Sequence, residues 1–267
     1  VELVVPHEHI DRKRVARLME RLEEDGRLVN PPITTYWKGR YVILDGATRY
    51  SSLQQLGYPY VVVQVVDQSQ PGFQLHTWYH AISADEQAQQ STFEQLAADL
   101  AQIPGLVLRP IAADEVQGAL SRPASLCYLM TRDGQVTLAE VAPDASRLKV
   151  MNAIVDAYNA WGSVERTLLT DIERLLAQFP RLVAVAVFPQ FAPPEVFDAA
   201  AAGDLLPAGL TRFVIPGRIL RLNADLERLK REEPLLEKRA WFNEFLSGKL
   251  SRSRLRYYQE PVVLLDE

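Results

Sequence analysis

The polar segment that joins an apolar strand to a helix is the part of this sequence best suited to chemistry. Residues 41–44 predict a strand, Asp45-Gly46 predicts a tight turn, and a helix is expected directly afterwards. A helix N-terminus presents unpaired N–H groups and a partial positive charge, which suit a phosphate. Thr48 and Arg49 would add a hydroxyl and a planar guanidinium, and the Asp45 carboxylate could hold Mg²⁺. An ordinary Asp-Gly turn beside a surface arginine would carry the same residues.

The four histidines are the other residues that could bind or catalyse. They stand at positions 7, 9, 76 and 80, and the last two are spaced as neighbours on one helix face. Such a pair could bind a metal or haem, but a polar surface role is the commoner explanation. The single cysteine, Cys127, excludes an internal disulfide framework and a zinc site built from several thiolates.

The composition is that of a folded, mildly acidic chain. It has 267 residues, 48% of them hydrophobic, and a net charge of −5. This balance disfavours a dedicated nucleic-acid binder, so DNA binding is possible but not favoured. A local basic cluster (Lys249, Arg252, Arg254 and Arg256) is more simply explained as a solvated helix face. There is no signal-like start and no apolar stretch long enough to span a bilayer, so we expect a cytoplasmic protein without membrane contact.

The elements that must position these residues fall into two parts. The first predicts strands at 3–5, 33–37, 41–44 and 60–66, with helices at 11–24 and 48–56. The second predicts helices near 91–102, 147–162, 163–178, 224–229 and 236–249, and strands near 126–131, 183–188, 212–215 and 262–265. Pro71-Gly72 is the best candidate boundary. We therefore predict a mixed α/β (α+β) chain with domains 1–70 and 71–267.

The segment Asp45-Gly-x-x-Arg49-Tyr resembles the phosphate motif of the ParB/sulfiredoxin superfamily and, within it, of the free L-serine kinases. The likeness is greatest to the branch that serves the staphyloferrin B siderophore pathway. It extends to residues 77–78, 163–166 and 207–213, and to a C-terminal pattern from Trp241 to Val262. The resemblance implies an N-terminal ParB/sulfiredoxin-like nucleotide-binding domain packed on a mixed α/β C-terminal domain that binds the substrate.

The resemblance also implies roles for particular residues. In this family a glutamate of the first loop is the general base, and Glu8 stands at the matching position. Asp45 matches the essential aspartate, with a catalytic, metal-binding or phosphate-positioning role, and Gly46, Ala47, Thr48 and Arg49 match the phosphate turn. Trp78, Thr211 and Arg212 are the candidates for serine binding. The activity implied is transfer of the terminal phosphate of ATP or ADP to serine with Mg²⁺, in a site between the two domains.

The sequence departs from the family pattern at Thr48, where the family has histidine. A hydroxyl can hydrogen-bond a phosphate but cannot neutralise it. Three alternatives therefore stay open: an inactive nucleotide sensor, a DNA-associated regulator, and a kinase for another small hydroxyl compound. The oligomeric state and the choice between ATP and ADP also stay open.

Overall fold

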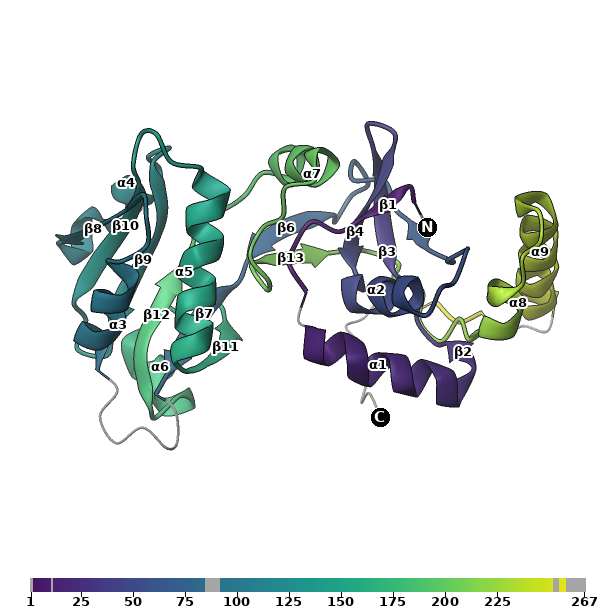
Figure 1. Ribbon diagram of the computed structural model, residues 1–267, viewed down its shortest axis with the longest axis horizontal. Coiled ribbons are helices and arrows are strands. Elements are labelled where there is room, and N and C mark those ends of the chain that lie inside the picture. Colours follow the sequence, from purple (N-terminus) through teal and green to yellow (C-terminus); the bar gives the residue numbers. More distant parts are fainter. Residues whose placement is uncertain (1, 11, 85–91, 252–254, 258–267) are drawn as a thin grey trace.

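A computed structural model describes residues 2–10, 12–84, 92–251 and 255–257 (Figure 1). Its first lobe is built on a small sheet with the strand order β1-β4-β3-β5. These strands are β1 (Val4–Val5), β3 (Ile33–Trp37), β4 (Arg40–Asp45) and β5 (Gln64–Val65). β1 runs parallel to β4, and β3 pairs antiparallel with β4 and parallel with β5. The expected strand at 60–66 is thus only two residues long.

Two helices accompany this sheet, as the apolar spacing predicted. In α1 (Arg12–Asp25), Val15 and Leu22 lie two turns apart and are both buried. The shorter α2 (Ala47–Gln55) begins directly after β4 and packs against α1. The turn between β4 and α2 is therefore fixed by the sheet on one side and by a helix pair on the other.

The second lobe contains a six-stranded antiparallel sheet with the order β11-β7-β12-β9-β10-β8. Its strands are β7 (Tyr79–Ser83), β8 (Leu106–Ile111), β9 (Ser125–Thr131), β10 (Val136–Val141), β11 (Ser163–Thr167) and β12 (Leu182–Val187). The expected helix at 163–178 was wrong in its first part, because residues 163–167 form the edge strand β11. Only α6 (Ile172–Gln178), capped by Asp171, is helical there.

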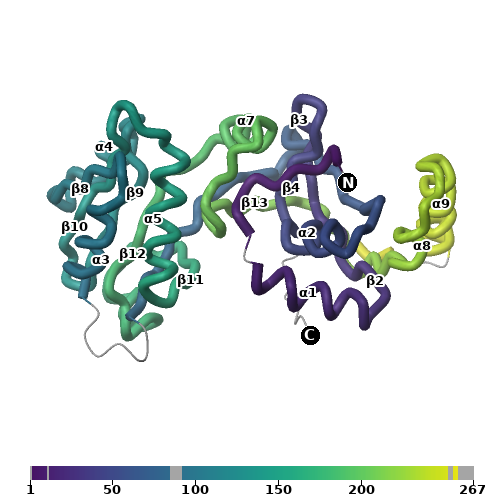
Figure 2. The backbone as a smooth tube through the Cα atoms, viewed as in Figure 1, coloured from purple at the N-terminus to yellow at the C-terminus, as the bar shows by residue number. Residues whose placement is uncertain are grey.

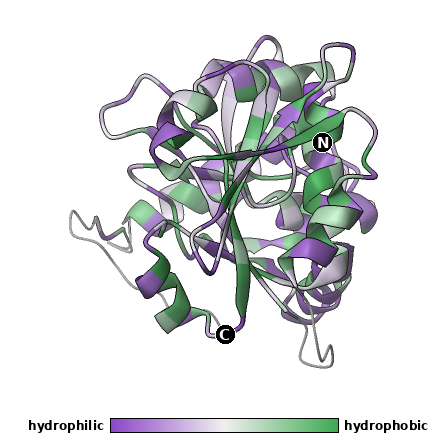
Figure 3. Ribbon diagram, turned by 90° about the vertical axis from the view of Figure 1, so that its left-hand side faces the viewer, coloured by the Kyte–Doolittle hydropathy of each residue, from purple (hydrophilic) through white to green (hydrophobic). Residues whose placement is uncertain are grey.

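Helices cover both faces of this sheet, since alternate strand residues belong to different cores. α3 (Phe93–Leu100) and α5 (Arg147–Trp161) pack on one face, over Ile82 and Leu129. α6 and α4 (Val116–Leu120) pack on the other, together with the short η1 (Ala113–Glu115) that precedes α4. Figure 3 shows hydrophilic and hydrophobic residues alternating along the outer helices, which is expected when one helix face is buried.

A two-stranded ribbon connects the lobes. β6 (Gln74–Thr77) pairs antiparallel with β13 (Thr211–Val214), and both run between the lobes in Figures 1 and 2. α7 (Pro193–Ala202) lies beside this ribbon, and its Asp198 accepts hydrogen bonds from Trp37 and Lys38 of the first lobe. The side chains that the ribbon carries are therefore within reach of both lobes.

After the ribbon the chain returns to the first lobe. β14 (Ala224–Asp225) pairs with β2 (Arg27–Leu28), and α8 (Leu226–Lys230) and α9 (Leu235–Ser251) follow. Leu222 to Leu229 share a core with Leu22, Leu28 and Leu53. The division into domains 1–70 and 71–267 stays a prediction, but part of the second segment is packed against the first.

The basic cluster and the strand predicted near the C-terminus lie only partly within the described residues. Lys249 lies in the last turn of α9, and Arg256 is exposed. Arg252, Arg254 and the strand expected at 262–265 lie outside the described residues. No helix among the described residues is both long enough and apolar enough to cross a membrane.

Candidate active site

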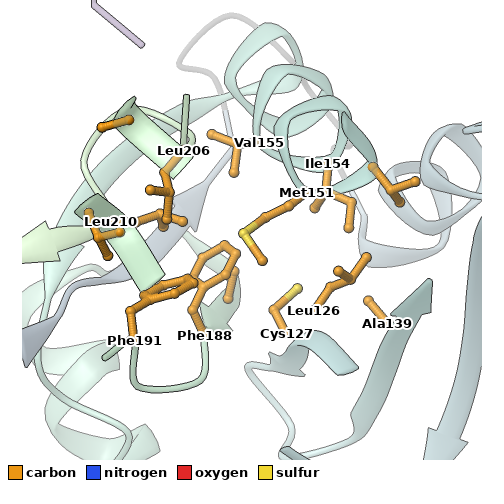
Figure 4. Packing of buried hydrophobic residues seen from close by; sticks show 14 of the residues in the cluster. Leu126, Cys127, Ala139, Met151, Ile154, Val155, Phe188, Phe191, Leu206 and Leu210 are labelled. Atoms are coloured by element: carbon orange, nitrogen blue, oxygen red, sulfur yellow. The ribbon is translucent and has the colours of Figure 1, made fainter. Parts of the chain in front are cut away.

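The loop after β1 is joined to the segment before β13 by backbone pairing. Leu206 N donates to His7 O at 2.8 Å, and His9 N donates to Leu206 O at 2.9 Å. Leu206 and Leu210 are buried in the main core, close to Val155 of α5 and Phe188 in Figure 4. The short segment between these two leucines is thus anchored at both ends, and it faces Glu8.

The Glu8 carboxylate is held by this segment. Gly209 N donates to Oε2 at 2.8 Å, and Thr211 donates to Oε1 from both N, at 2.5 Å, and Oγ1, at 2.6 Å. The side chain is only 14% exposed. Hydrogen bonds of this kind fix the position of a carboxylate.

The Asp45 turn has the conformation that its glycine suggested. Gly46 is left-handed, with φ of 87°, and a Cβ there would lie 3.0 Å from both the Arg49 guanidinium and Pro32 Cα. Both the backbone and the packing therefore require glycine. The turn places Asp45 at the end of β4 and Ala47 and Thr48 in the first turn of α2.

Two arginines contact the Asp45 carboxylate. Arg218 Nη1 lies 2.6 Å and Arg49 Nη2 lies 3.4 Å from Oδ2. Burial acts to raise the pKa of Asp45, but the charges of Arg49 and Arg218 outweigh it and hold that pKa below its ordinary value. Arg218 was not predicted. It follows β13 in the chain, so only the tertiary structure brings it to the turn.

Arg49 has a structural contact that the motif did not suggest. Its Nη1 donates to the carbonyls of Asn30 and Pro31, at 2.8 and 3.2 Å. It therefore braces the loop before β3 against the Asp45 turn. Its role toward phosphate stays a prediction.

Glu8 and the Asp45 turn meet through β4 and β13. His7 Nδ1 contacts the carbonyl oxygen of Ile43, two residues before Asp45, and His7 Nε2 lies 2.6 Å from Thr211 Oγ1. Arg218 also donates to Phe213 O of β13, at 3.2 Å. The expected base and the expected phosphate turn are thus parts of one connected site.

The expected serine-binding residues lie on or next to the ribbon. The Arg212 guanidinium lies over the Trp78 ring, 5.1 Å from its centroid, and Trp78 N donates to Leu210 O at 2.7 Å. Thr211 differs from the expectation in its direction, since its N–H and hydroxyl both contact Glu8. A direct contact between Thr211 and serine stays a prediction.

Behind the Glu8-binding segment lies a buried histidine. His80 Nε2 contacts Gly209 O at 3.1 Å, and its Nδ1 contacts the Tyr158 hydroxyl at 2.5 Å. Because a carbonyl only accepts, Nε2 carries the proton and Nδ1 accepts from Tyr158. Burial lowers the pKa of His80 to about 4, so the ring is neutral at physiological pH.

His76 and His80, whose spacing would make them neighbours on a helix, do not lie on one. His76 lies on β6 and His80 on β7, in different sheets. Within the described part of the chain, no group of three or more histidine, cysteine or acidic residues is arranged to hold a metal ion. The spacing looked helical only because the break at Trp78 is not visible in the sequence.

Comparison with known proteins gives relatives of one kind. The chain is 28% identical to the ATP-dependent L-serine kinase SbnI of Staphylococcus aureus over 276 aligned residues, which cover 100% of this chain and 95% of the relative. An ATP-dependent L-serine kinase of Staphylothermus marinus is 34% identical over 84 residues, 31% of this chain and 33% of that one. No family model matches the chain.

Solved structures agree on the fold. SbnI with a C-terminal truncation gives a TM-score of 0.71 at 23% identity, over 93% of this chain and 94% of that one. A free serine kinase in complex with AMP gives 0.69 at 20% identity, over 85% and 90%. The predicted mixed α/β class is confirmed. The resemblance to the free L-serine kinases that the sequence indicated is therefore confirmed as well, over the whole chain in sequence and most of it in fold.

Proposed function

We propose that this protein is a free L-serine kinase that transfers the terminal phosphate of ATP, or of ADP, to the serine hydroxyl and releases O-phospho-L-serine. One observation carries the proposal. A fixed, nearly buried Glu8 carboxylate is connected through β13 to a phosphate-type turn at Asp45. The chain also matches an ATP-dependent L-serine kinase from end to end.

Glu8 is the general base of this mechanism. A hydroxyl is a weak nucleophile, and a placed carboxylate accepts its proton as the oxygen attacks phosphorus. Thr211 donates to Oε1 from both its N–H and its hydroxyl, whereas the donor that the described residues supply to Oε2 is Gly209 N. The second lone pair of Oε2 therefore leaves room for a serine hydroxyl.

The nucleotide phosphates are assigned to the Asp45 turn. The N–H groups of Gly46, Ala47 and Thr48 open α2 and suit the β- and terminal phosphates. Arg218 adds a cation that is 36% exposed and lies 2.6 Å from Asp45. A phosphate arriving at the turn would compete with Asp45 for the Arg218 guanidinium. Arg49 supports the turn from behind.

The donors at this turn are suitable for Mg²⁺. That ion usually takes one or two protein carboxylates and completes its shell with phosphate oxygens and water. Asp45 supplies one carboxylate, and Arg218 beside it would be drawn toward the phosphates. When bound, Mg²⁺ would neutralise charge on the transferring group.

The serine substrate is assigned to Trp78 and Arg212. A guanidinium that stacks on an aromatic ring through its face keeps its N–H edges for a carboxylate. Arg212 could therefore grip the serine carboxylate while Trp78 forms the wall. Thr211, on the same strand, would position the hydroxyl through its contact with Glu8.

The test is to incubate the protein with L-serine, Mg²⁺ and either ATP or ADP, and to measure O-phosphoserine by mass spectrometry. Wild type should form product with at least one donor. Glu8→Gln should lower the rate by about a hundredfold or more, since general-base catalysis contributes about 10² to 10⁴. Glu20→Gln, at an exposed position on α1, is the matched control and should behave as wild type. Nucleotide binding without product from either donor would refute the proposal and favour a sensor, or a kinase for another compound.

A further inference from the structure

Glu8 is the end of a chain of three side chains that the family resemblance does not explain. Thr211 Oγ1 lies 2.6 Å from Glu8 Oε1 and 2.6 Å from His7 Nε2, and the other ring nitrogen of His7 contacts Ile43 O. His7 is 4% exposed. The inference below rests on the proposed role of Glu8 as base.

The protons needed by this chain can be counted. A carbonyl only accepts, so His7 Nδ1 must carry a proton. Each of the two 2.6 Å contacts at Thr211 needs one hydrogen between its atoms, but the hydroxyl supplies only one. The other comes either from His7 Nε2 or from Glu8. The three side chains therefore hold one proton beyond those of a neutral imidazole, a hydroxyl and a carboxylate.

The surroundings decide which end holds this proton. Imidazole is intrinsically a stronger base than carboxylate. The N–H groups of Gly209 and Thr211 stabilise the charged form of Glu8, and the Ile43 carbonyl faces the protonated Nδ1 of His7. We propose that His7 holds the shared proton, and that Thr211 links the imidazolium to Glu8 so that Glu8 stays ionised and ready to accept the serine proton.

Other charged or titratable groups lie near the chain and belong to the same balance. Asp45 lies two residues after Ile43 on β4, and Arg218 donates to Phe213 O on β13. Arg166 of β11 lies so near Gly209 that a Cβ there would be 2.7 Å from its Nε. His80 of β7 contacts Gly209 O from behind and is neutral. Phe213 presents its ring edge-on to His7, with centroids 5.4 Å apart. Unlike these groups, His7 and Glu8 are joined through the Thr211 hydroxyl.

Glu8 and His7 have different roles in the phosphate transfer to serine. The serine O–H bond breaks and its proton goes to a Glu8 oxygen. The serine oxygen forms the new bond to phosphorus, while the bond from phosphorus to the leaving nucleotide oxygen breaks. The proton on Glu8 leaves to solvent after product release. His7 does not touch the reacting atoms in this scheme. It is a positioning residue that keeps Glu8 free of a proton beforehand.

The first test is independent of catalysis. Only four histidines are present, so each imidazole ¹⁵N signal can be assigned with single His→Gln variants. At neutral pH without nucleotide, His7 should carry protons on both ring nitrogens. In Glu8→Gln and in Thr211→Val, Nε2 should lose its proton while Nδ1 keeps it. A neutral His7 in the wild type, or an unchanged imidazolium in both variants, would overturn the proposal even if the protein is an active kinase.

The second test is the pH dependence of kcat. His7→Gln and Thr211→Val should move the acidic limb of the profile to higher pH by about one unit, which is about a tenfold loss on that limb, and should recover at alkaline pH. Thr211→Ser, which keeps the hydroxyl, should retain the wild-type profile, as should His76→Gln, a half-buried control on β6 whose ring contacts Gln74. An equal loss at every pH, or a higher KM for serine with the same limb, would overturn the proposal and assign Thr211 to structure or to serine binding. Absence of product from the wild type would instead count against the kinase itself, and the ¹⁵N result would stand.

Discussion

The buried His80 should make the stability of this protein depend on pH in a calculable way. Its ordinary pKa of 6.5 falls to about 4 in the folded chain because burial disfavours the charged ring. Between these two values the unfolded chain binds more protons than the folded chain. Stability is therefore complete above pH 6.5, falls as the pH drops through this window, and loses nothing more from His80 below pH 4.

The size of the effect follows from the same two values. From about pH 7.5 to about pH 5, the linkage relation gives a loss of about 2 kcal/mol in the free energy of unfolding for this one group. His80→Gln removes the titration but keeps an amide that can donate to Gly209 O and accept from Tyr158. The variant should therefore lose about 2 kcal/mol less than the wild type over this range.

Urea unfolding at the two pH values, followed by circular dichroism, measures both slopes. The carboxylates and the other three histidines are common to both proteins, so their contributions cancel in the comparison. His76→Gln removes a half-buried histidine whose ring contacts Gln74, and it should keep the wild-type slope. Equal pH dependence in His80→Gln and wild type would show that His80 is not held neutral, and the reasoning from its burial would be wrong.

Three further outcomes are expected. Gly46→Ala should destabilise the protein by about 2 kcal/mol in urea unfolding, because φ is 87° and the new Cβ would press on Pro32; Gly134→Ala, with positive φ but open space, should cost less. Cys127 should not react with a thiol reagent in the native protein, since burial raises the pKa of its thiol to about 12, and should react fully in guanidinium; native reactivity would contradict its burial. Arg218→Ala should weaken nucleotide binding about tenfold by calorimetry, while the exposed Arg122→Ala should not; equal affinities would exclude Arg218 from the phosphate site.

The sequence alone determined the features that depend on local order. Strand, turn and helix at residues 40–55 were predictable because β-branched runs, an Asp-Gly pair and helical apolar spacing act over a few residues. The mixed α/β class and the resemblance to serine kinases followed from motifs in their order along the chain, and both were confirmed. The residue roles that the resemblance implied, including that of Glu8, stay predictions until the variants are measured.

The tertiary structure decided what long-range contacts determine. No local pattern distinguishes an edge strand from a helix at residues 163–167, where pairing with β7 decides. The contact of Thr211 with Glu8 spans 203 residues and could not be predicted from the sequence, while its contact with serine stays a prediction. Arg218 reaches Asp45 across 173 residues, and His7 reaches Thr211 across 204. The charge and proton balance of the site depends on these contacts between residues far apart in the sequence, because electrostatic interactions act through space and not along the chain.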